Sequence, residues 1–412
     1  MFATRLVCKG CGADYPLEAR FACDQCFGPL EAAYDDDAIA RSVTREQILA
    51  GPSTLWRYAS FLPVAPPARG LPVGNSPLIA ADRLAEELGL RCKLYVKTET
   101  SNPTHSFKDR VVAVAAAKAV ELGFEALGCA STGNLAGATA AAGAALGLPT
   151  YIFVPDDLER EKILSAAAYG ATVFEVNGTY DDVNRLCSEL AYDRPWAFVN
   201  VNLRPYYAEG SKTIAHETVE QLGWRVPDRV VAPIASGSLY TKILRGFRES
   251  RATGLAGDGP DEPVMHGAQG AGCSPVATAF ASGGNDVFPV RPTGIAKSLA
   301  IGNPADGVFA VGVARETGGS IEAADDDEIV EGIRLLARTT GIFTETAGGV
   351  TTAVLKKIAE RGEIGPDETV VAYITGDGLK TIDAVEPSIE TVRIEADPDQ
   401  VEAFIDGRVT TA

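Results

Sequence analysis

From Lys93 onward, short apolar runs alternate with longer stretches of helical composition, and this alternation most constrains the fold. Short apolar runs bounded by turn residues are typical of buried strands. Strands that alternate with helices form parallel sheets joined by right-handed crossovers. We expect strands at 93–97, 127–130, 150–154, 172–176, 197–200, 229–234, 263–267 and 369–375. The sequence therefore predicts an α/β protein with parallel sheets flanked by helices.

Lys108 follows the first of these strands, within Ser-Asn-Pro-Thr-His-Ser-Phe-Lys-Asp-Arg at 101–110. The alanine-rich run 111–120 predicts a helix, with Ser106 as candidate cap and Lys108 in the first turn. The positive end of a helix and burial both disfavour a charged ammonium. We therefore expect a neutral amine that can form a Schiff base with an aldehyde. An isolated lysine is more often an ordinary surface residue.

Three other strand-to-helix turns carry small residues and hydroxyls. They are Ser-Thr-Gly-Asn at 131–134, Ala-Ser-Gly-Ser-Leu at 235–239, and Thr-Gly-Asp-Gly-Leu-Lys at 375–380. Backbone N–H groups at the start of a helix bind phosphate, so such turns suit an anionic ligand. Each turn taken singly is a weak signal.

Taken together and in this order, the four motifs resemble those of the pyridoxal-phosphate (PLP) enzymes of the tryptophan synthase β-like fold, known as fold type II. The segments 202–213 and 295–304 resemble the threonine synthases in particular. The resemblance implies a two-domain fold, with a small PLP domain at 106–193 and a large one formed by 35–105 with 194–390. The cofactor would lie in the cleft between them. We interpret residues 391–412 as a C-terminal tail.

The resemblance also implies roles for residues of the motifs. Lys108 would bind PLP covalently and later move protons. The other implied cofactor-binding residues are Phe107 near the ring, Asn134 at the phenolic oxygen, Thr375 at the pyridine nitrogen, and Ala235, Ser236, Gly237, Ser238 and Leu239 at the phosphate. A hydroxyl at the pyridine nitrogen cannot keep it fully protonated, which favours elimination and replacement over transamination.

The implied reaction converts O-phospho-L-homoserine and water to L-threonine and phosphate. By resemblance, Ser131 and Thr132 would bind the carboxylate of this small phosphorylated amino acid. Three alternatives are a related enzyme acting on O-phosphoserine, such as a cysteate synthase, a threonine or serine dehydratase, and a catalytically silent zinc-ribbon interaction protein. The intact set of Lys108, Asn134 and Thr375 argues against the silent protein.

The site for the substrate phosphate departs from the shorter threonine synthases, because Ala300 and Tyr207 stand where arginines are expected by resemblance. A dianion in a partly desolvated cleft still requires cationic donors. We expect Arg204, Lys297 and Lys212 to supply them. The alternative is that Arg204 merely pairs with an acidic neighbour and that Lys297 lies on the surface.

Four cysteines near the N-terminus follow the pattern C-x2-C-x11-C-x2-C, at Cys8, Cys11, Cys23 and Cys26. This spacing is typical of a closed tetrathiolate zinc site, which has no open position for catalysis. The sequence therefore predicts a zinc-ribbon-like module at 1–34 with a structural zinc; a vacant or iron-loaded site is the alternative. The long form of threonine synthase, which this chain resembles, carries a similar module.

Length and charge limit the remaining function classes. A chain of 412 residues can form two to three domains. Its net charge of −18 argues against nucleic acid or an acidic membrane as a partner. We find no signal sequence and no apolar run near the roughly 20 residues that span a membrane. We therefore expect a cytoplasmic protein, and a homodimer.

Overall fold

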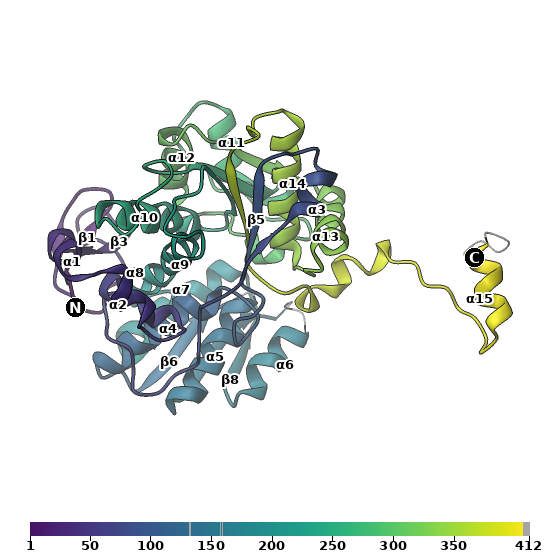
Figure 1. Ribbon diagram of the computed structural model, residues 1–412. Helices are drawn as coiled ribbons and strands as arrows, with labels where there is room; N and C mark the ends of the chain where they lie inside the picture. The colour runs from purple at the N-terminus through teal and green to yellow at the C-terminus, as the bar shows by residue number, and fades with distance from the viewer. Residues whose placement is uncertain (132, 157, 159, 407–412) are drawn as a thin grey trace.

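The computed structural model describes residues 1–412 except 132, 157, 159 and 407–412, and in this part of the chain the strands form three sheets (Figure 1). The strands are β1 (Ala3–Cys8), β2 (Asp14–Tyr15), β3 (Leu30–Tyr34), β4 (Leu78–Ala80), β5 (Lys93–Thr98), β6 (Ala126–Ala130), β7 (Thr150–Pro155), β8 (Thr172–Val176), β9 (Trp196–Phe198), β10 (Arg229–Pro233), β11 (Val264–Gly270), β12 (Ile321–Ala324) and β13 (Thr369–Ile374).

The α-helices of the described residues are α1 (Asp36–Ser42), α2 (Arg45–Leu49), α3 (Asp82–Glu87), α4 (Lys108–Glu121), α5 (Asn134–Leu146), α6 (Arg160–Ala168), α7 (Tyr180–Asp193), α8 (Arg204–Gly210), α9 (Thr213–Gln221), α10 (Ser238–Ala252), α11 (Pro275–Ala281), α12 (Gly307–Glu316), α13 (Asp326–Thr340), α14 (Thr346–Glu360) and α15 (Pro398–Ile405).

The largest sheet has the strand order β12-β11-β10-β13-β5-β4, and its strands are parallel except for β4. Neighbouring residues of its strands point to opposite faces. Val230 packs with the core that includes α9 and α10, whereas Val231 packs with the core that includes α13 and α14. Burial on both faces explains why the central strands β10 and β13 contain continuous apolar runs. The predicted strands are confirmed here; β4 and β12 were not predicted.

The second sheet has the order β8-β7-β6-β9 and is parallel throughout. Residues of α4 and α5 pack with one of its buried clusters, and residues of α7 pack with the other. Its edge strand β9 pairs with β6 although it lies beyond residue 193. The predicted boundary of the small domain at 193 is therefore one strand too early, because strand pairing, and not sequence order, decides which sheet a segment joins.

The N-terminal module is the third sheet, β2-β1-β3, which is antiparallel. It packs against α8 and α10 of the main body. Glu31 of β3 pairs with Lys242 at 2.9 Å and with Arg245 at 3.0 Å, and the hydroxyl of Tyr206 donates to the carbonyl of Glu18 at 2.9 Å. The module is thus held by partly buried polar contacts as well as by apolar packing.

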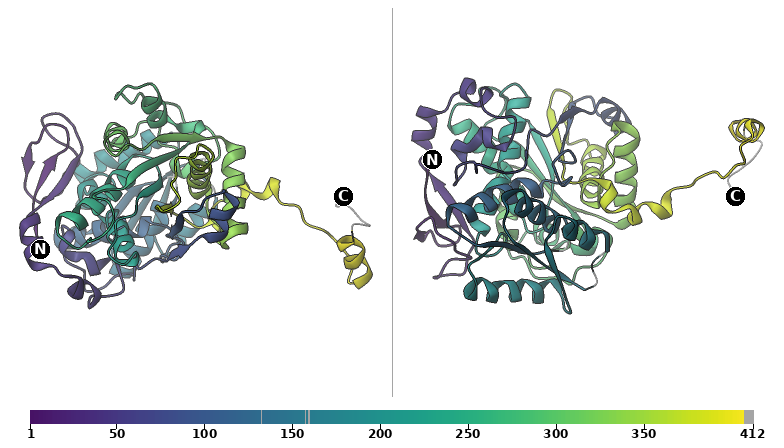
Figure 2. Two further views of the ribbon diagram at one scale, coloured as in Figure 1. Left: turned by 45° about the horizontal axis from the view of Figure 1, so that its top comes forward. Right: turned by 90° about the horizontal axis from the view of Figure 1, so that it is seen from below.

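The C-terminal segment leads away from the body and carries α15 at a distance from it, as the three views agree (Figures 1 and 2). Within the described residues, we find no helix that combines the length and the apolar character needed to cross a membrane. The cytoplasmic location and the homodimer stay predictions.

Candidate active site

A cavity of about 310 Å³ opens where β6, β10 and β13 end. Ligands of parallel α/β sheets bind at the carboxyl ends of strands, so this is the expected place for a cofactor. The predicted residues that line the cavity are Phe107, Lys108, Ser131, Asn134, Arg204, Ala235, Ser236, Gly237, Ser238, Leu239 and Thr375. Thr132 lies outside the described residues. The structure therefore brings together predicted residues from five separate parts of the chain.

Lys108 is the first residue of α4, as the sequence predicts, but Ser106 does not cap this helix. Phe107 is the N-cap residue, and the Ser106 hydroxyl is buried without a hydrogen-bond partner among the described residues. The helix start is held by the backbone instead: the amide of Phe107 donates to the carbonyl of Thr375 at 2.9 Å. This bond places Lys108 next to the end of β13.

The amine of Lys108 points toward aromatic side chains. Its Nζ donates to the Tyr207 hydroxyl at 3.0 Å and lies 4.7 Å from the centre of the Phe107 ring. Lys108 is half-buried and lines the cavity, so a ligand can still reach it. Sequence reasoning noted Tyr207 only as the residue at an expected arginine position. The structure shows it as the hydrogen-bond partner of the Lys108 amine.

Asn134 is held by hydrogen bonds to Glu345 and Lys380, and sequence reasoning predicted neither contact. Its Nδ2 donates to the carboxylate of Glu345 at 2.9 Å, and its Oδ1 accepts from Lys380 Nζ at 2.9 Å. Burial raises the pKa of Glu345 and lowers the pKa of Lys380. Glu345 is the N-cap residue of α14, and its only sequence signal is a lone carboxylate among small residues just before that helix.

The loop 235–239 leads into α10 with the geometry of an anion site. Gly237 is the N-cap residue, and no side chain caps the helix, so the first amides of α10 lack a side-chain acceptor. Gly237 has a φ of 92°, and a Cβ there would lie 2.7 Å from the carbonyl oxygen of Asp306. Only glycine fits this close approach, because a larger residue would displace the backbone.

Arg204 lines the cavity and pairs with an acidic neighbour, Asp306. Its Nη2 donates to Asp306 Oδ2 at 2.6 Å, and the Asp306 side chain is only 6% exposed. Burial by itself raises the pKa of Asp306, but Arg204 and Lys9 outweigh burial and hold that pKa below its usual value. A guanidinium carries five N–H donors, so this pairing leaves others for a ligand.

Lys212 and Lys297, two of the predicted phosphate ligands, do not line the cavity. Lys212 is fully buried and pairs with Glu209 and Glu249, each at 2.8 Å. A buried ammonium must be paired, and these carboxylates satisfy that need. Lys297 is exposed on a short 3₁₀ turn. Of the three predicted phosphate ligands, Arg204 is the one that lines the cavity.

Two residues that line the cavity each carry a buried polar atom without a hydrogen-bond partner among the described residues. The Oδ1 of Asn200 and the Oγ of Ser298 are buried, and neither has a hydrogen-bond partner within the described part of the chain. Both residues line the cavity. Buried polar atoms are almost always hydrogen-bonded in folded proteins, so these two atoms are exceptions at the cavity wall. Sequence reasoning assigned neither residue a role.

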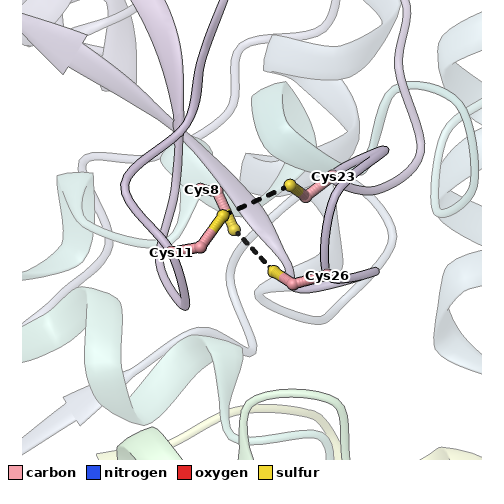
Figure 3. A group of neighbouring side chains, drawn as sticks. All are labelled: Cys8, Cys11, Cys23 and Cys26. Atoms are coloured by element: carbon pink, nitrogen blue, oxygen red, sulfur yellow. Dashed lines mark hydrogen bonds between the residues drawn. The ribbon is translucent and has the colours of Figure 1, made fainter.

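The four N-terminal cysteines converge from two turns of the module (Figure 3). Their Sγ atoms lie within 4.8 Å of one another, and the closest pairs are Cys8–Cys26 at 3.4 Å and Cys11–Cys23 at 3.5 Å. Sulfurs at about 2.3 Å from a tetrahedral zinc would be roughly 3.8 Å apart. The arrangement fits a metal ion.

Comparison with solved structures supports the predicted fold. The processed form of threonine deaminase isoform 2 from Solanum lycopersicum matches with a TM-score of 0.64 at 21% identity, over 90% of this chain and 97% of that chain. At this level of identity the likeness concerns the fold alone. It confirms a fold type II architecture with parallel sheets.

Comparison with known sequences gives a closer match. A threonine synthase of Methanocaldococcus jannaschii is 39% identical over 396 residues, covering 95% of this chain and 96% of that protein. A threonine synthase of Methanosarcina acetivorans is 37% identical over 399 residues, covering 95% and 97%. Residues 70–376 match the family described as "Pyridoxal-phosphate dependent enzyme". With Lys108 at the cavity and these matches along the chain, the protein belongs to the family of pyridoxal-phosphate dependent enzymes.

Proposed function

We propose that this protein is a threonine synthase, which converts O-phospho-L-homoserine and water to L-threonine and phosphate. The observation that carries the proposal is the similarity to threonine synthases over 95% of this chain. The cavity supports it, since it combines a lysine amine, an anion-binding loop and an arginine. The substrate class would then be a small phosphorylated amino acid.

The residues around the cavity fit PLP. The amine of Lys108 would bind the aldehyde, and the uncapped start of α10 would hold the phosphate. Asn134 and Thr375 would meet the oxygen and the nitrogen of the ring, and both line the cavity. When bound, PLP supplies an electron sink that stabilises the charge left by a departing proton.

Residues of the protein would move the protons and bind the substrate. Lys108 Nζ would take the proton from Cα of the substrate and move protons at Cβ and Cγ, because it is the amine that faces the cavity. Tyr207 would hold that amine through its hydroxyl. Ser131 would orient the substrate carboxylate, and Arg204 would bind the phosphate that leaves from Cγ. Water then adds at Cβ to give threonine.

An assay of phosphate release from O-phosphohomoserine and O-phosphoserine, side by side, tests the proposed function. We expect release from O-phosphohomoserine together with formation of threonine. Release from O-phosphoserine alone would overturn the proposal in favour of a related replacement enzyme. Absence of turnover with both substrates, in protein that carries PLP, would also contradict it.

The four cysteines are proposed to hold a structural zinc, because a closed tetrathiolate stabilises a small module without contacting substrate. We expect Cys23→Ser to lower the zinc content and Tm of the protein, whereas kcat of the remaining folded enzyme changes little. Metal analysis, thermal unfolding and kinetics measure these effects. Cys92→Ser is the matched control, since Cys92 is a buried cysteine far from the cluster in sequence, and it should keep its zinc. Native protein without zinc or iron would contradict the proposal.

A further inference from the structure

A lysine of the four-cysteine module pairs with the same carboxylate as Arg204, a residue that lines the active-site cavity. Lys9 lies in the turn between Cys8 and Cys11, and its Nζ pairs with Asp306 Oδ1 at 2.9 Å. The lysine side chain is only 13% exposed. Phe21, from the same module, lines the cavity directly. Two residues of the module therefore approach the site that the main body forms.

Asp306 is shared between two cations. One carboxylate oxygen accepts from Lys9 at 2.9 Å, and the other accepts from Arg204 at 2.6 Å. The backbone of Asp306 is also tied to the loop 235–239, because its amide donates to the carbonyl of Ser236 at 2.9 Å. Asp306 therefore links the module and Arg204 through its carboxylate, and the loop 235–239 through its backbone.

Both the backbone and the side chain of Lys9 are held in place. Its amide donates to the carbonyl of Pro29 at 2.9 Å, and its Nζ lies 4.1 Å from the centre of the Phe309 ring. The next amide, of Gly10, donates to Cys8 Sγ at 3.4 Å, so the cysteine turn sets the lysine backbone. Lys9 therefore differs from a mobile surface lysine, whose ion pairs contribute little to stability.

We propose that Lys9 is a positioning residue for Arg204, and that the four-cysteine module thereby helps to set the affinity of the cavity for the substrate phosphate. The inference rests on the proposed function, in which Arg204 binds that phosphate. With Lys9 present, two cations share one carboxylate, so the group keeps a net positive charge that favours a dianion. Without Lys9, Arg204 and Asp306 form a neutral pair, which holds Arg204 more tightly and attracts the phosphate less.

Kinetics of Lys9→Met holoenzyme test this inference, with inorganic phosphate as a competing ligand. We expect the inhibition constant of inorganic phosphate and KM for the phosphorylated substrate to rise at least about fivefold, the lower end of typical coupling between sites. We expect kcat to change less than KM, and Lys9→Arg to recover most of the loss. Arg5→Met is the matched control, because Arg5 is a module cation that pairs with Asp14 on the exposed surface.

A double-mutant cycle separates positioning from simple anchoring. In an Arg204→Met background, Lys9→Met should change the inhibition constant of phosphate and KM by less than about twofold. The reason is that the effect of Lys9 passes through Arg204. Additive effects would overturn the inference. A Lys9→Met variant that loses zinc or Tm but keeps wild-type phosphate inhibition would show anchoring only, and would also overturn it. If Arg204→Met itself leaves phosphate inhibition and KM unchanged, the proposed phosphate site fails, and the inference fails with it.

Discussion

Replacing Lys108 with alanine is expected to abolish turnover and the visible absorption of the bound cofactor. Lys108 is the amine that faces the cavity, 3.0 Å from the Tyr207 hydroxyl, and it would serve both as the covalent anchor of PLP and as the proton carrier. Losing a positioned acid and base alone lowers rates by about 10²–10⁴-fold, so we expect at least the upper end of this range. Absorption spectra and single-turnover kinetics measure both effects.

Tyr207→Phe is the matched control for this variant. It removes the hydroxyl that accepts from Lys108 but leaves the amine in place. We expect it to keep the cofactor spectrum and to lose less activity than Lys108→Ala. Borohydride reduction followed by peptide mass analysis should find the modified residue at Lys108 in the wild type. A reducible linkage that persists in Lys108→Ala would refute the assignment.

Replacing Arg110 with methionine is expected to destabilise the protein strongly. Arg110 is fully buried, two residues after Lys108, and its guanidinium pairs with Glu99 at 2.6 Å and with Glu217 at 2.8 Å. Lys97 pairs with the same Glu217 at 2.6 Å, so the two carboxylates balance two cations. Removing one partner of a buried ion pair costs about 3–5 kcal/mol, because a charge stays buried without compensation. Urea unfolding of matched holoenzyme samples measures the loss.

Arg338→Met is the surface control for this variant. Arg338 pairs with Glu87 at 3.2 Å and with Glu331 at 2.8 Å, and its side chain is 47% exposed. Exposed pairs contribute about 0–1 kcal/mol, so the control should unfold almost like the wild type. If Arg110→Met is no less stable than Arg338→Met, the buried network does not stabilise the fold.

The Arg110 effect should also depend on pH in a defined direction. Burial raises the pKa of Glu217, but Arg110 and Lys97 outweigh burial and hold that pKa well below its usual value. A group with a depressed folded pKa contributes stability above its unfolded pKa, about 4.3 for glutamate, and loses it as pH falls toward the folded value. The stability difference between wild type and Arg110→Met should therefore shrink below about pH 4.3.

Local sequence patterns predicted which motifs line the cavity, but they did not predict the side chains that hold those motifs in place. The motif around Lys108, the loop 235–239 and Thr375 all line the cavity, because each follows a strand whose end position is set by a short apolar run. The bonds that hold Asn134 come from Glu345 and Lys380, which are more than 200 residues away in the sequence. No local pattern indicates such a pairing.

The sequence by itself determined the α/β class, most strands of the parallel sheets, the helix that begins at Lys108 and the four-cysteine cluster, because these depend on residue spacing within short segments. Only the tertiary structure decided which cations face the cavity. Arg204 lines it, whereas Lys212 is neutralised by buried glutamates and Lys297 is exposed. The physical reason is that burial and ion pairing of a charged side chain depend on segments that only the folded chain brings together.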